Sequence, residues 1–334
     1  MKTFDRLYFS IIIPVYNRPE EIHQLLNSIV NQTSKVDEVI IVEDGSTNTC
    51  NHIIIDFEDK LNIKYFYKEN SGPGSSRNYG YEKAKGNYCI FLDSDCILPQ
   101  NYIKNVQKSL VKNYVDAYGG PDNANHDFSH WQKAINYSMT SYFTTGGIRG
   151  KNESLCKFQP RSFNMGYSRD VFNATKGFSN MRYGEDIDMS IRIIKHGFKT
   201  GLIHNAFVWH KRKSNIIQFI KQTYNFGCGR VENILRHPET IHIIHFLPTF
   251  FLLFTITSII ISIFTSWFFM FPLISVTIII AVDSFIKNKN PLIALLSIAT
   301  SFIQILSYGT GFFVAMLSHF FKHLQLAKIK DKKD

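Results

Sequence analysis

The sequence YCIFLDSD at residues 88–95 places two carboxylates, Asp93 and Asp95, directly after an apolar run. A short run rich in aromatic and β-branched residues indicates a buried strand. Two carboxylates separated by one residue repel each other unless a cation or several hydrogen-bond donors lie between them. Oxygen ligands of this kind suit Mg²⁺ or Mn²⁺, which bridge carboxylates to phosphates. The stretch therefore predicts a buried strand that ends at a divalent metal site.

Three similar runs precede residues 88–95, and helical patterns separate them. The expected strands are 10–15, 38–42, 63–67 and 88–92, and the expected helices are 20–31, 50–61 and 75–84. Strands and helices that alternate along a chain predict a mostly parallel sheet with helices on both faces. Ligands of such sheets bind at the carboxyl ends of the strands. The expected fold class is therefore α/β, with a Rossmann-like, mostly parallel sheet.

The segments that follow the first two strands are unusually polar. Pro14-Val15-Tyr16-Asn17-Arg18 closes the first strand, and Glu43-Asp44-Gly45-Ser46 closes the second. Taken alone, Asp44 is equally compatible with a helix cap, because a carboxylate in this place accepts hydrogen bonds from the next helical turn. A binding role for Asp44 therefore depends on the motifs around it.

The charge of the chain is unevenly distributed. The 334 residues include 37 Lys and Arg against 27 Asp and Glu, which gives a net charge of +10. Residues 1–194 carry 22 basic and 22 acidic side chains, whereas residues 195–236 carry eight basic side chains and one acidic side chain. The basic excess is therefore local, and we expect it to face a diphosphate or anionic lipid. No nucleic acid partner is expected.

The composition excludes several classes of protein. With 45% hydrophobic and 14% aromatic residues, the chain is neither disordered nor fibrous. Its five cysteines include no CxxC pair, which argues against a disulfide framework or zinc cluster and favours a reducing compartment. The first residues, MKTFDRLYF, carry charges where a signal peptide has its apolar core. We therefore expect the N-terminal domain on the cytoplasmic side.

A long apolar region follows residue 240. Residues 241–282 contain no Asp, Glu, Lys or Arg. The candidates for membrane spans are approximately 246–264, 267–286 and 292–317, and a helix of about nineteen residues reaches about 28 Å, close to the hydrocarbon thickness. Three simple spans would place the lysine-rich tail outside, against the positive-inside rule. Either residues 308–311 break the last segment or one segment lies along the surface, so two to four segments are expected.

Four motifs in order resemble the family 2 glycosyltransferases of the GT-A fold. These motifs are SIIIPVYNR at 10–18, VEDGS at 42–46, SGPGSSRNYG at 71–80 and FLDSD at 91–95. The similarity covers roughly residues 8–215, and the order and spacing of the motifs are more specific than any one of them. The resemblance implies a nucleotide-diphosphate sugar as donor, preferably a UDP-sugar, a divalent metal, Mg²⁺ or Mn²⁺, and inversion at the anomeric carbon.

The resemblance also assigns residues to the donor and the metal. The donor-binding residues it implies are Pro14, Tyr16, Asn17, Asp44, Arg77, Asp93 and Arg212. Asp44 would hold the nucleobase or ribose, Asp93 would lie nearer the ribose, and Asp95 would bind the metal directly. Arg77 has an alternative role, which is to pair with a nearby carboxylate. His210 would complete the metal site with Asp93 and Asp95, since a neutral imidazole suits Mn²⁺.

The segment Arg182-Tyr183-Gly184-Glu185-Asp186-Ile187-Asp188 resembles the ED motif of the family. The resemblance makes Asp186 the general base, because an inverting displacement needs one carboxylate within reach of the acceptor hydroxyl. Glu185 would hold the acceptor, and Asp188 would complement the helix dipole.

A second segment resembles the acceptor side of these enzymes. In residues 159–169, the positions that match are Asn164, Met165 and Arg169. They would lie at the acceptor, or they would form a packed strand and turn beneath it.

The segment that leads into the apolar region indicates which kind of family 2 enzyme to expect. Residues 219–237 resemble the corresponding segment of membrane-attached enzymes of the ExoA succinoglycan type. We expect transfer of one sugar to a polyprenyl-diphosphate-linked glycan during surface polysaccharide synthesis, by a multi-pass protein of the inner membrane. A polyprenyl-monophosphate glycosyltransferase and a non-catalytic nucleotide-sugar-binding membrane protein are the alternatives. The expected domains are a transferase domain at 1–213, an interfacial linker at 214–240, a membrane domain at 241–320 and a basic cytoplasmic tail at 321–334.

Overall fold

The computed structural model describes residues 7–123, 128–145, 158–211, 213 and 215–330. Its chain divides into two compact units, and each combines two separate stretches of sequence. Unit 1 comprises Met1–Asn125 and Glu153–Lys211, and unit 2 comprises His126–Asn152 and Arg212–Asp334. Residues 128–145, which the expected domain boundaries include in the transferase domain, therefore pack with the C-terminal helices.

Unit 1 is built on one large sheet and one small sheet. The large sheet has the order β3-β2-β1-β4-β8-β6-β9, and the small sheet has the order β5-β10-β7. The strands are β1 (Phe9–Val15), β2 (Glu38–Asp44), β3 (Ile63–Lys68), β4 (Tyr88–Leu92), β5 (Cys96–Ile97), β6 (Ala117–Gly119), β7 (Asp122–Asn123), β8 (Asn164–Ser168), β9 (Thr200–Leu202) and β10 (Val208–His210). The helices are α1 (Pro19–Val30), α2 (Asn51–Ile54), α3 (Pro73–Lys83), α4 (Tyr102–Lys112), α7 (Arg169–Thr175) and α8 (Glu185–Lys195).

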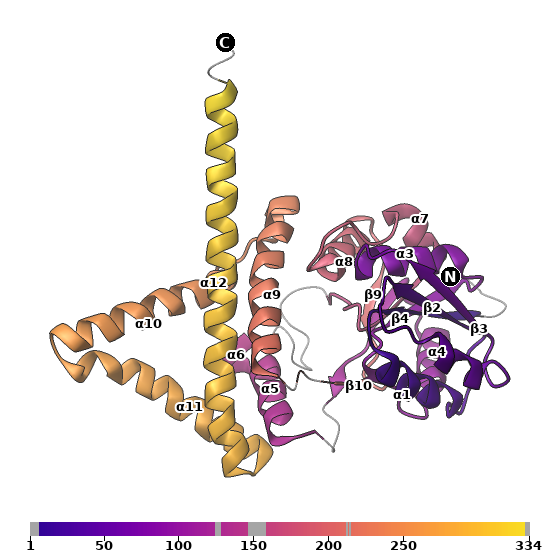
Figure 1. Cartoon of the computed structure of the whole chain (residues 1–334), viewed down its shortest axis with the longest axis horizontal. Helices are drawn as coiled ribbons and strands as arrows, with labels where there is room; N and C mark the ends of the chain where they lie inside the picture. Colours follow the sequence, from indigo (N-terminus) through magenta and orange to yellow (C-terminus); the bar gives the residue numbers. More distant parts are fainter. Residues whose placement is uncertain (1–6, 124–127, 146–157, 212, 214, 331–334) are drawn as a thin grey trace. The chain divides into compact units, whose positions relative to one another are not determined.

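The pairing of the large sheet confirms the expected fold class. β1 pairs in parallel with β2 and β4, and β2 pairs in parallel with β3. β8 is inserted antiparallel between β4 and β6. The sheet is therefore mostly parallel, and Figure 1 shows helices packed around it.

The central strands are covered on both faces. Ile11 and Ile13 lie in one hydrophobic cluster with residues of α1 and α4, whereas Ile12 lies in a second cluster with residues of α3, α7 and α8. Successive side chains of a strand point to opposite faces, so a continuous apolar run can bury both faces of its strand. This explains why three of the expected strands, β1, β2 and β4, lie inside the sheet, whereas the fourth, β3, is only partly buried at its edge.

Unit 2 is helical. Its helices are α5 (His130–Thr140), α6 (Tyr142–Thr145), α9 (Ile216–Arg236), α10 (Leu247–Phe264), α11 (Phe271–Asn288) and α12 (Pro291–Lys330). In Figure 1, α5 and α9 lie beside α12, and the contacts between these helices agree with the view. The helical stretches long and apolar enough to span a membrane are Leu247–Phe264, Trp267–Asn288 and Pro291–Lys322.

The glycines of the last apolar segment do not break it, which corrects one of the expected alternatives. α12 runs continuously through Gly309 and Gly311. A Cβ on Gly311 would overlap the backbone oxygen of Tyr224 in α9, and a Cβ on Gly227 would lie 2.6 Å from the backbone nitrogen of Phe312. The missing side chains therefore allow α9 and α12 to approach closely, as small residues do between membrane helices.

Gly311→Ala is expected to destabilise unit 2. Alanine inside a helix is normally more favourable than glycine by about 1 kcal/mol. Here the added methyl group must push α9 away from α12, and such overpacking costs roughly 1–3 kcal/mol. Thermal unfolding of the full chain in detergent measures the effect. Ser318→Ala, at an exposed position of the same helix, is the control. Equal midpoints for the two variants would contradict a close contact at Gly311.

Candidate active site

The turn formed by Asp93, Ser94 and Asp95 connects β4 to β5 at the carboxyl end of β4. The Asp93 N–H donates to the Phe163 carbonyl at 3.4 Å, and the Cys96 N–H donates to the Asp93 carbonyl at 3.1 Å. The Asp93 side chain is 30% exposed and that of Asp95 is 10% exposed. The two carboxylates therefore lie at the edge of the sheet where the sequence predicts a site.

His210 reaches this turn through the small sheet. β10 pairs antiparallel with β5, which places His210 opposite Cys96, and the Lys211 N–H donates to the Asp95 carbonyl at 3.1 Å. Nε2 of His210 consequently lies 3.1 Å from Oδ1 of Asp95. The imidazole stacks on Phe163, with ring centroids 5.1 Å apart. The structure thus brings together two of the predicted metal ligands from distant parts of the chain.

Arg18 forms an ion pair with Oδ2 of the same Asp95 carboxylate. Burial lowers the pKa of Arg18, but the carboxylates of Asp95 and Asp93 raise it more, so the pKa lies above its usual value. The guanidinium therefore stays charged and neutralises Asp95. Arg18 was not among the predicted site residues, although its position in the polar segment between β1 and α1 was a usable signal.

The donor atoms near Asp95 fit a divalent cation. Atoms of Asp95, Cys96 and His210 lie within 4.8 Å of one another. Burial raises the pKa of the Cys96 thiol well above its usual value, and the thiol donates to the Phe163 carbonyl at 3.4 Å. Since metals bind the thiolate form of cysteine, the ligands that remain are the Asp95 carboxylate and the His210 imidazole. An oxygen and a nitrogen donor suit Mn²⁺ well and Mg²⁺ less well.

Arg77 joins the two acidic motifs. Its guanidinium donates to Oδ1 of Asp93 at 2.7 Å and to Oε1 of Glu185 at 2.8 Å, and the residue is only 2% exposed. Burial lowers the pKa of Arg77, but these two carboxylates raise it to a net value above the usual one. Arg77 therefore acts as a buried bridge. These contacts are those of the alternative role, a pairing with nearby carboxylates, and a contact of Arg77 with the donor stays a prediction.

Glu185 and Asp186 differ in their surroundings at the start of α8. Glu185 is 7% exposed, and burial raises its pKa, with Asp186 adding to the rise and Arg77 opposing it. The expected contact of Glu185 with an acceptor is therefore not supported, because its carboxylate is buried and accepts a hydrogen bond from Arg77. Asp188 pairs with Arg192 one turn later at 2.7 Å, which is consistent with a structural role in the helix.

Asp186 is the more accessible carboxylate of the pair. Its side chain is 18% exposed, its Oδ1 accepts a hydrogen bond from the Ile187 N–H at 2.8 Å, and its Oδ2 lies 3.6 Å from Nη1 of Arg161. One carboxylate oxygen is thus held by the backbone and the other faces a basic residue. Arg161, which sequence reasoning also missed, lies in the predicted acceptor segment at residues 159–169.

Asp44 organises the loop between β3 and α3. Its carboxylate accepts hydrogen bonds from the N–H groups of Ser71, at 3.0 Å, and Gly72, at 2.9 Å, and pairs with Lys68. The residue is 4% exposed. These contacts fix the start of α3, from which Arg77 projects. A contact between Asp44 and the nucleobase or ribose stays a prediction.

The first motif holds a second loop in place. Asn17 adopts a left-handed backbone conformation, with φ of 52°, and its side-chain oxygen accepts from the N–H groups of Thr47 and Asn48 at 2.9 Å each. Asparagine tolerates this conformation better than most residues. Tyr16 beside it is 53% exposed and Pro14 is half-buried in β1. Of these three, Tyr16 is the side chain most available to a donor.

The three predicted acceptor residues are used inside the fold. Asn164 is fully buried, accepts from the Tyr102 hydroxyl at 2.6 Å and donates to the Ala206 carbonyl at 2.8 Å. Met165 is fully buried in β8, and Arg169 donates to the Gly86 carbonyl at 2.7 Å. For Asn164 and Met165 this burial supports the other alternative, a packed strand, whereas a contact of the partly buried Arg169 with an acceptor stays a prediction. Arg212 lies outside the described residues.

Comparison with known sequences gives the family. Residues 10–174 match the family model of glycosyl transferase family 2. An uncharacterized glycosyltransferase of Rickettsia bellii is 41% identical over 104 residues, which are 31% of this chain and 15% of that protein. Glycosyltransferase GlyA of Streptococcus pneumoniae is 36% identical over 108 residues, which are 32% of this chain and 16% of that protein. Glycosyltransferase AglE of Haloferax volcanii is 27% identical over 233 residues, 67% of this chain and 73% of that protein. The match thus spans less than a fifth of the length of the first two relatives.

Solved structures share the fold at low sequence identity. Mannosyltransferase PcManGT from Pyrobaculum calidifontis, in complex with GDP-Man and Mn²⁺, gives a TM-score of 0.61 at 14% identity, over 91% of this chain and 86% of that chain. S. aureus TarS 1–349, in complex with UDP-GlcNAc, gives a TM-score of 0.51 at 18% identity, over 93% and 92%. The family match shows that the region at residues 10–174 belongs to glycosyl transferase family 2, and the solved structures show that the chain shares the GT-A fold.

Proposed function

We propose that this chain is a metal-dependent, inverting glycosyltransferase. It moves one sugar from a nucleotide-diphosphate sugar, preferably a UDP-sugar, to a polyprenyl-diphosphate-linked glycan in the membrane, during surface polysaccharide synthesis. One observation carries the proposal: the buried Arg77 holds Asp93 and Glu185 together, at 2.7 and 2.8 Å. Asp95 and Asp186, the proposed metal ligand and base, are close to these two residues in the chain.

Asp95 and His210 would hold the divalent cation, Mn²⁺ or Mg²⁺. When bound, such a cation neutralises the charge that accumulates on a departing diphosphate. Arg18 places a further positive charge beside Asp95 and would help to bind the diphosphate. The presence of GDP-Man with Mn²⁺ in PcManGT, and of UDP-GlcNAc in TarS, supports a nucleotide-sugar donor for this chain as well.

Asp186 is the proposed general base. It would accept the proton of the acceptor hydroxyl while the hydroxyl oxygen attacks the anomeric carbon and the diphosphate leaves from the opposite face. Because the bond forms on the face opposite to the bond that breaks, the configuration inverts. Arg161, 3.6 Å from Oδ2, would orient the carboxylate. Glu185 is unsuited to this role, since it is 7% exposed and bonded to Arg77.

The long apolar helices support a membrane-bound acceptor. Residues 247–264, 267–288 and 291–322 have the length and composition of membrane spans. We propose a multi-pass inner-membrane protein. Its catalytic unit faces the cytoplasm, which would supply the nucleotide-sugar donor. An acceptor anchored in the same membrane would be concentrated at the enzyme.

Analysis of the lipid product tests the proposal. The full chain in nanodiscs is supplied with radiolabelled UDP-sugars and GDP-sugars, Mn²⁺ or Mg²⁺, and lipid acceptors, and the products are separated by thin-layer chromatography. An extended glycan on a diphosphate is the expected product. One sugar on a polyprenyl monophosphate would instead establish the alternative enzyme. Donor binding without any product would support the non-catalytic alternative.

His210→Ala is expected to weaken Mn²⁺ binding by at least about 10-fold, on the scale seen when support for a metal site is removed. The imidazole lies 3.1 Å from Asp95, so the variant removes the nitrogen donor of the proposed pair. Calorimetric titration of the full chain with Mn²⁺, without donor, measures the dissociation constant. His52→Ala, at an exposed position of α2, is the matched control. If both variants bind Mn²⁺ like the unmodified protein, His210 is not a ligand.

A further inference from the structure

Helices α5 and α6 belong to unit 2, although their sequence lies between strands β7 and β8 of unit 1. One side of α5 is apolar and packed. Ile135 and Met139 form a hydrophobic cluster with Phe219 of α9, and Ile303 of α12 packs against this cluster. Burial of an apolar face in this way anchors α5 to the helices that follow the transferase sequence.

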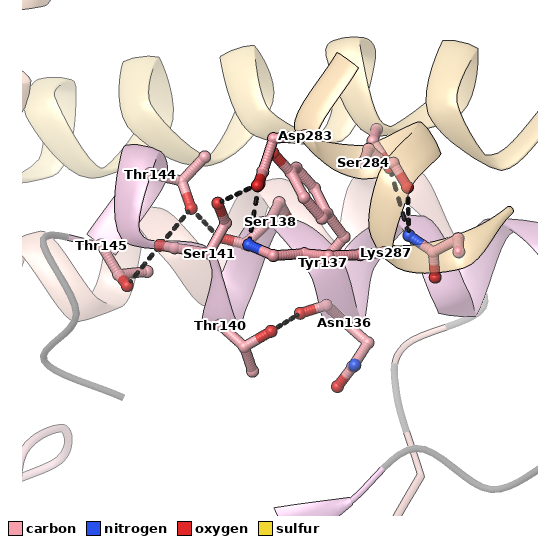
Figure 2. Close-up of polar contacts among 12 residues, drawn as sticks. Asn136, Tyr137, Ser138, Thr140, Ser141, Thr144, Thr145, Asp283, Ser284 and Lys287 are labelled. Carbon is pink, nitrogen blue, oxygen red and sulfur yellow. Dashed lines mark hydrogen bonds and ion pairs between the residues drawn. The ribbon is translucent and has the colours of Figure 1, made fainter. Parts of the chain in front are cut away.

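A polar contact fixes α5 to α11 as well. Figure 2 shows Asp283 of α11 facing this part of the chain: its Oδ2 accepts hydrogen bonds from the Tyr137 hydroxyl at 2.6 Å and from the Ser141 hydroxyl at 3.2 Å. Lys287, one turn later, donates to the same oxygen at 2.8 Å. A carboxylate in an apolar membrane helix is costly and is normally paired. Here three donors converge on it, and two come from the segment 137–141.

A third contact joins α5 to α12. The Thr300 hydroxyl donates to the Ala134 carbonyl at 3.0 Å, and Thr300 is fully buried. Thus α5 is hydrogen-bonded to two helices, and each of these helices contains a stretch with the properties of a membrane span. The contact with Asp283 fixes the depth of α5 along α11. Asp283 and Lys287 lie five residues and one residue before the end of α11 at Asn288. Charged residues near the end of a span lie at the boundary between lipid and water.

Two large aromatic side chains follow directly after this contact. In α6, Tyr142 is 69% exposed and Phe143 is 53% exposed. Aromatic residues are enriched where membrane helices meet water, because their rings are apolar and tyrosine keeps a polar tip. We propose that α5 and α6 form a membrane-interface element that inserts Tyr142 and Phe143 into the boundary of the bilayer. The transferase sequence would then be attached to lipid at a second point, besides residues 216–330.

Accessibility of a spin label tests this element in the full chain in lipid nanodiscs. The background is Cys156→Ser with Cys228→Ser, because Cys50, Cys89 and Cys96 are buried. The label is placed by Phe143→Cys, and the controls are Phe254→Cys, in α10, and Val111→Cys, which is 81% exposed in α4. Collisions with oxygen, which enters lipid, are compared with collisions with a water-soluble nickel chelate.

The expected result is an oxygen-to-nickel ratio at position 143 several-fold above that at 111 and nearer to that at 254. A water-like ratio at 143 with a lipid-like ratio at 254 overturns the inference but leaves the proposed membrane placement intact. Water-like ratios at both positions overturn both. A label at 143 that is immobilised and shielded from both reagents indicates a protein partner, such as a second copy, and also overturns the inference.

A second measurement tests whether the Asp283 contact positions the element. Asp283→Ala combined with Tyr137→Phe should shift the ratio at 143 towards that of water, because residues 137–141, which lead into α6, lose their hydrogen bonds to α11. Ser275→Ala is the matched control in α11, since the Ser275 hydroxyl donates to the Phe271 carbonyl of its own helix at 2.9 Å. An unchanged lipid-like ratio in the double variant would show that Asp283 does not position α6, and would overturn that part of the inference.

Discussion

Asp186→Asn is expected to lower kcat for sugar transfer by about 10²- to 10⁴-fold, the range that general base catalysis contributes. Asparagine keeps the size of the side chain and an oxygen that can accept from the Ile187 N–H, 2.8 Å away in the present structure. It cannot take a proton from the acceptor hydroxyl. Donor binding should remain, because Asp95 and His210, which we assign to the metal and diphosphate, are unchanged. Initial rates at saturating donor, together with calorimetric titration with the nucleotide sugar, separate the two effects.

The matched control for this variant is Asp59→Asn, which makes the same chemical change at an exposed position of unit 1. Its rate should equal that of the unmodified enzyme. Glu185→Gln provides a second comparison, since it removes the neighbouring charge without removing the proposed base. Full turnover in Asp186→Asn would exclude Asp186 as the general base. The base of this enzyme would then be unassigned.

Arg77→Met is expected to destabilise unit 1 by about 3–5 kcal/mol, because removal of one partner leaves a buried charge unpaired. Glu185 and Asp93 both lose their hydrogen bonds to the guanidinium, and Glu185 is 7% exposed. For a domain of this size the midpoint of thermal unfolding should fall by roughly 6–20 °C. The unfolding midpoint of Arg77→Lys should lie between those of Arg77→Met and the unmodified protein. Lysine keeps the positive charge, but its single ammonium group cannot reproduce a planar guanidinium that reaches two carboxylates.

A second substitution distinguishes the loss of charge pairing from a loss of packing. Glu185→Gln in the Arg77→Met background removes the buried charge that the first change leaves behind, so part of the stability should return. Arg182→Met is the control, because Arg182 is exposed and its guanidinium lies 5.8 Å from the centroid of the Tyr183 ring. A midpoint for Arg77→Met equal to that of Arg182→Met would show that the bridge contributes little to stability.

Local sequence patterns were sufficient to place the central strands. The expected run at 88–92 is β4 itself, and the run at 10–15 is β1 with one residue added at its start. Burial on both faces requires an unbroken apolar run, so the pattern and the position in the sheet have the same cause. The expected helix at 50–61 was less regular, since α2 ends at Ile54 and a 3-10 turn, Ile55–Phe57, follows.

The pairing of the strands after β4 could not be predicted from the sequence. β8 pairs antiparallel with both β4 and β6, and the small sheet joins β5, β7 and β10, two or three residues each. Strands this short carry too few residues for a periodic signal. Their partners are chosen by contacts between distant segments, and a one-residue change in register reverses which side chains face the core.

The sequence alone determined the family of this protein, its mostly parallel sheet and the position of Asp93 and Asp95 at the end of a central strand. Only the tertiary structure decided that Arg77 bridges Asp93 and Glu185, that Arg18 neutralises Asp95, and that α5 packs with the C-terminal helices. The physical reason is the distance along the chain between the residues that interact. An apolar strand and the polar turn after it follow from neighbouring residues, whereas the partner of a buried charge depends on which distant groups the folded chain brings within hydrogen-bonding distance.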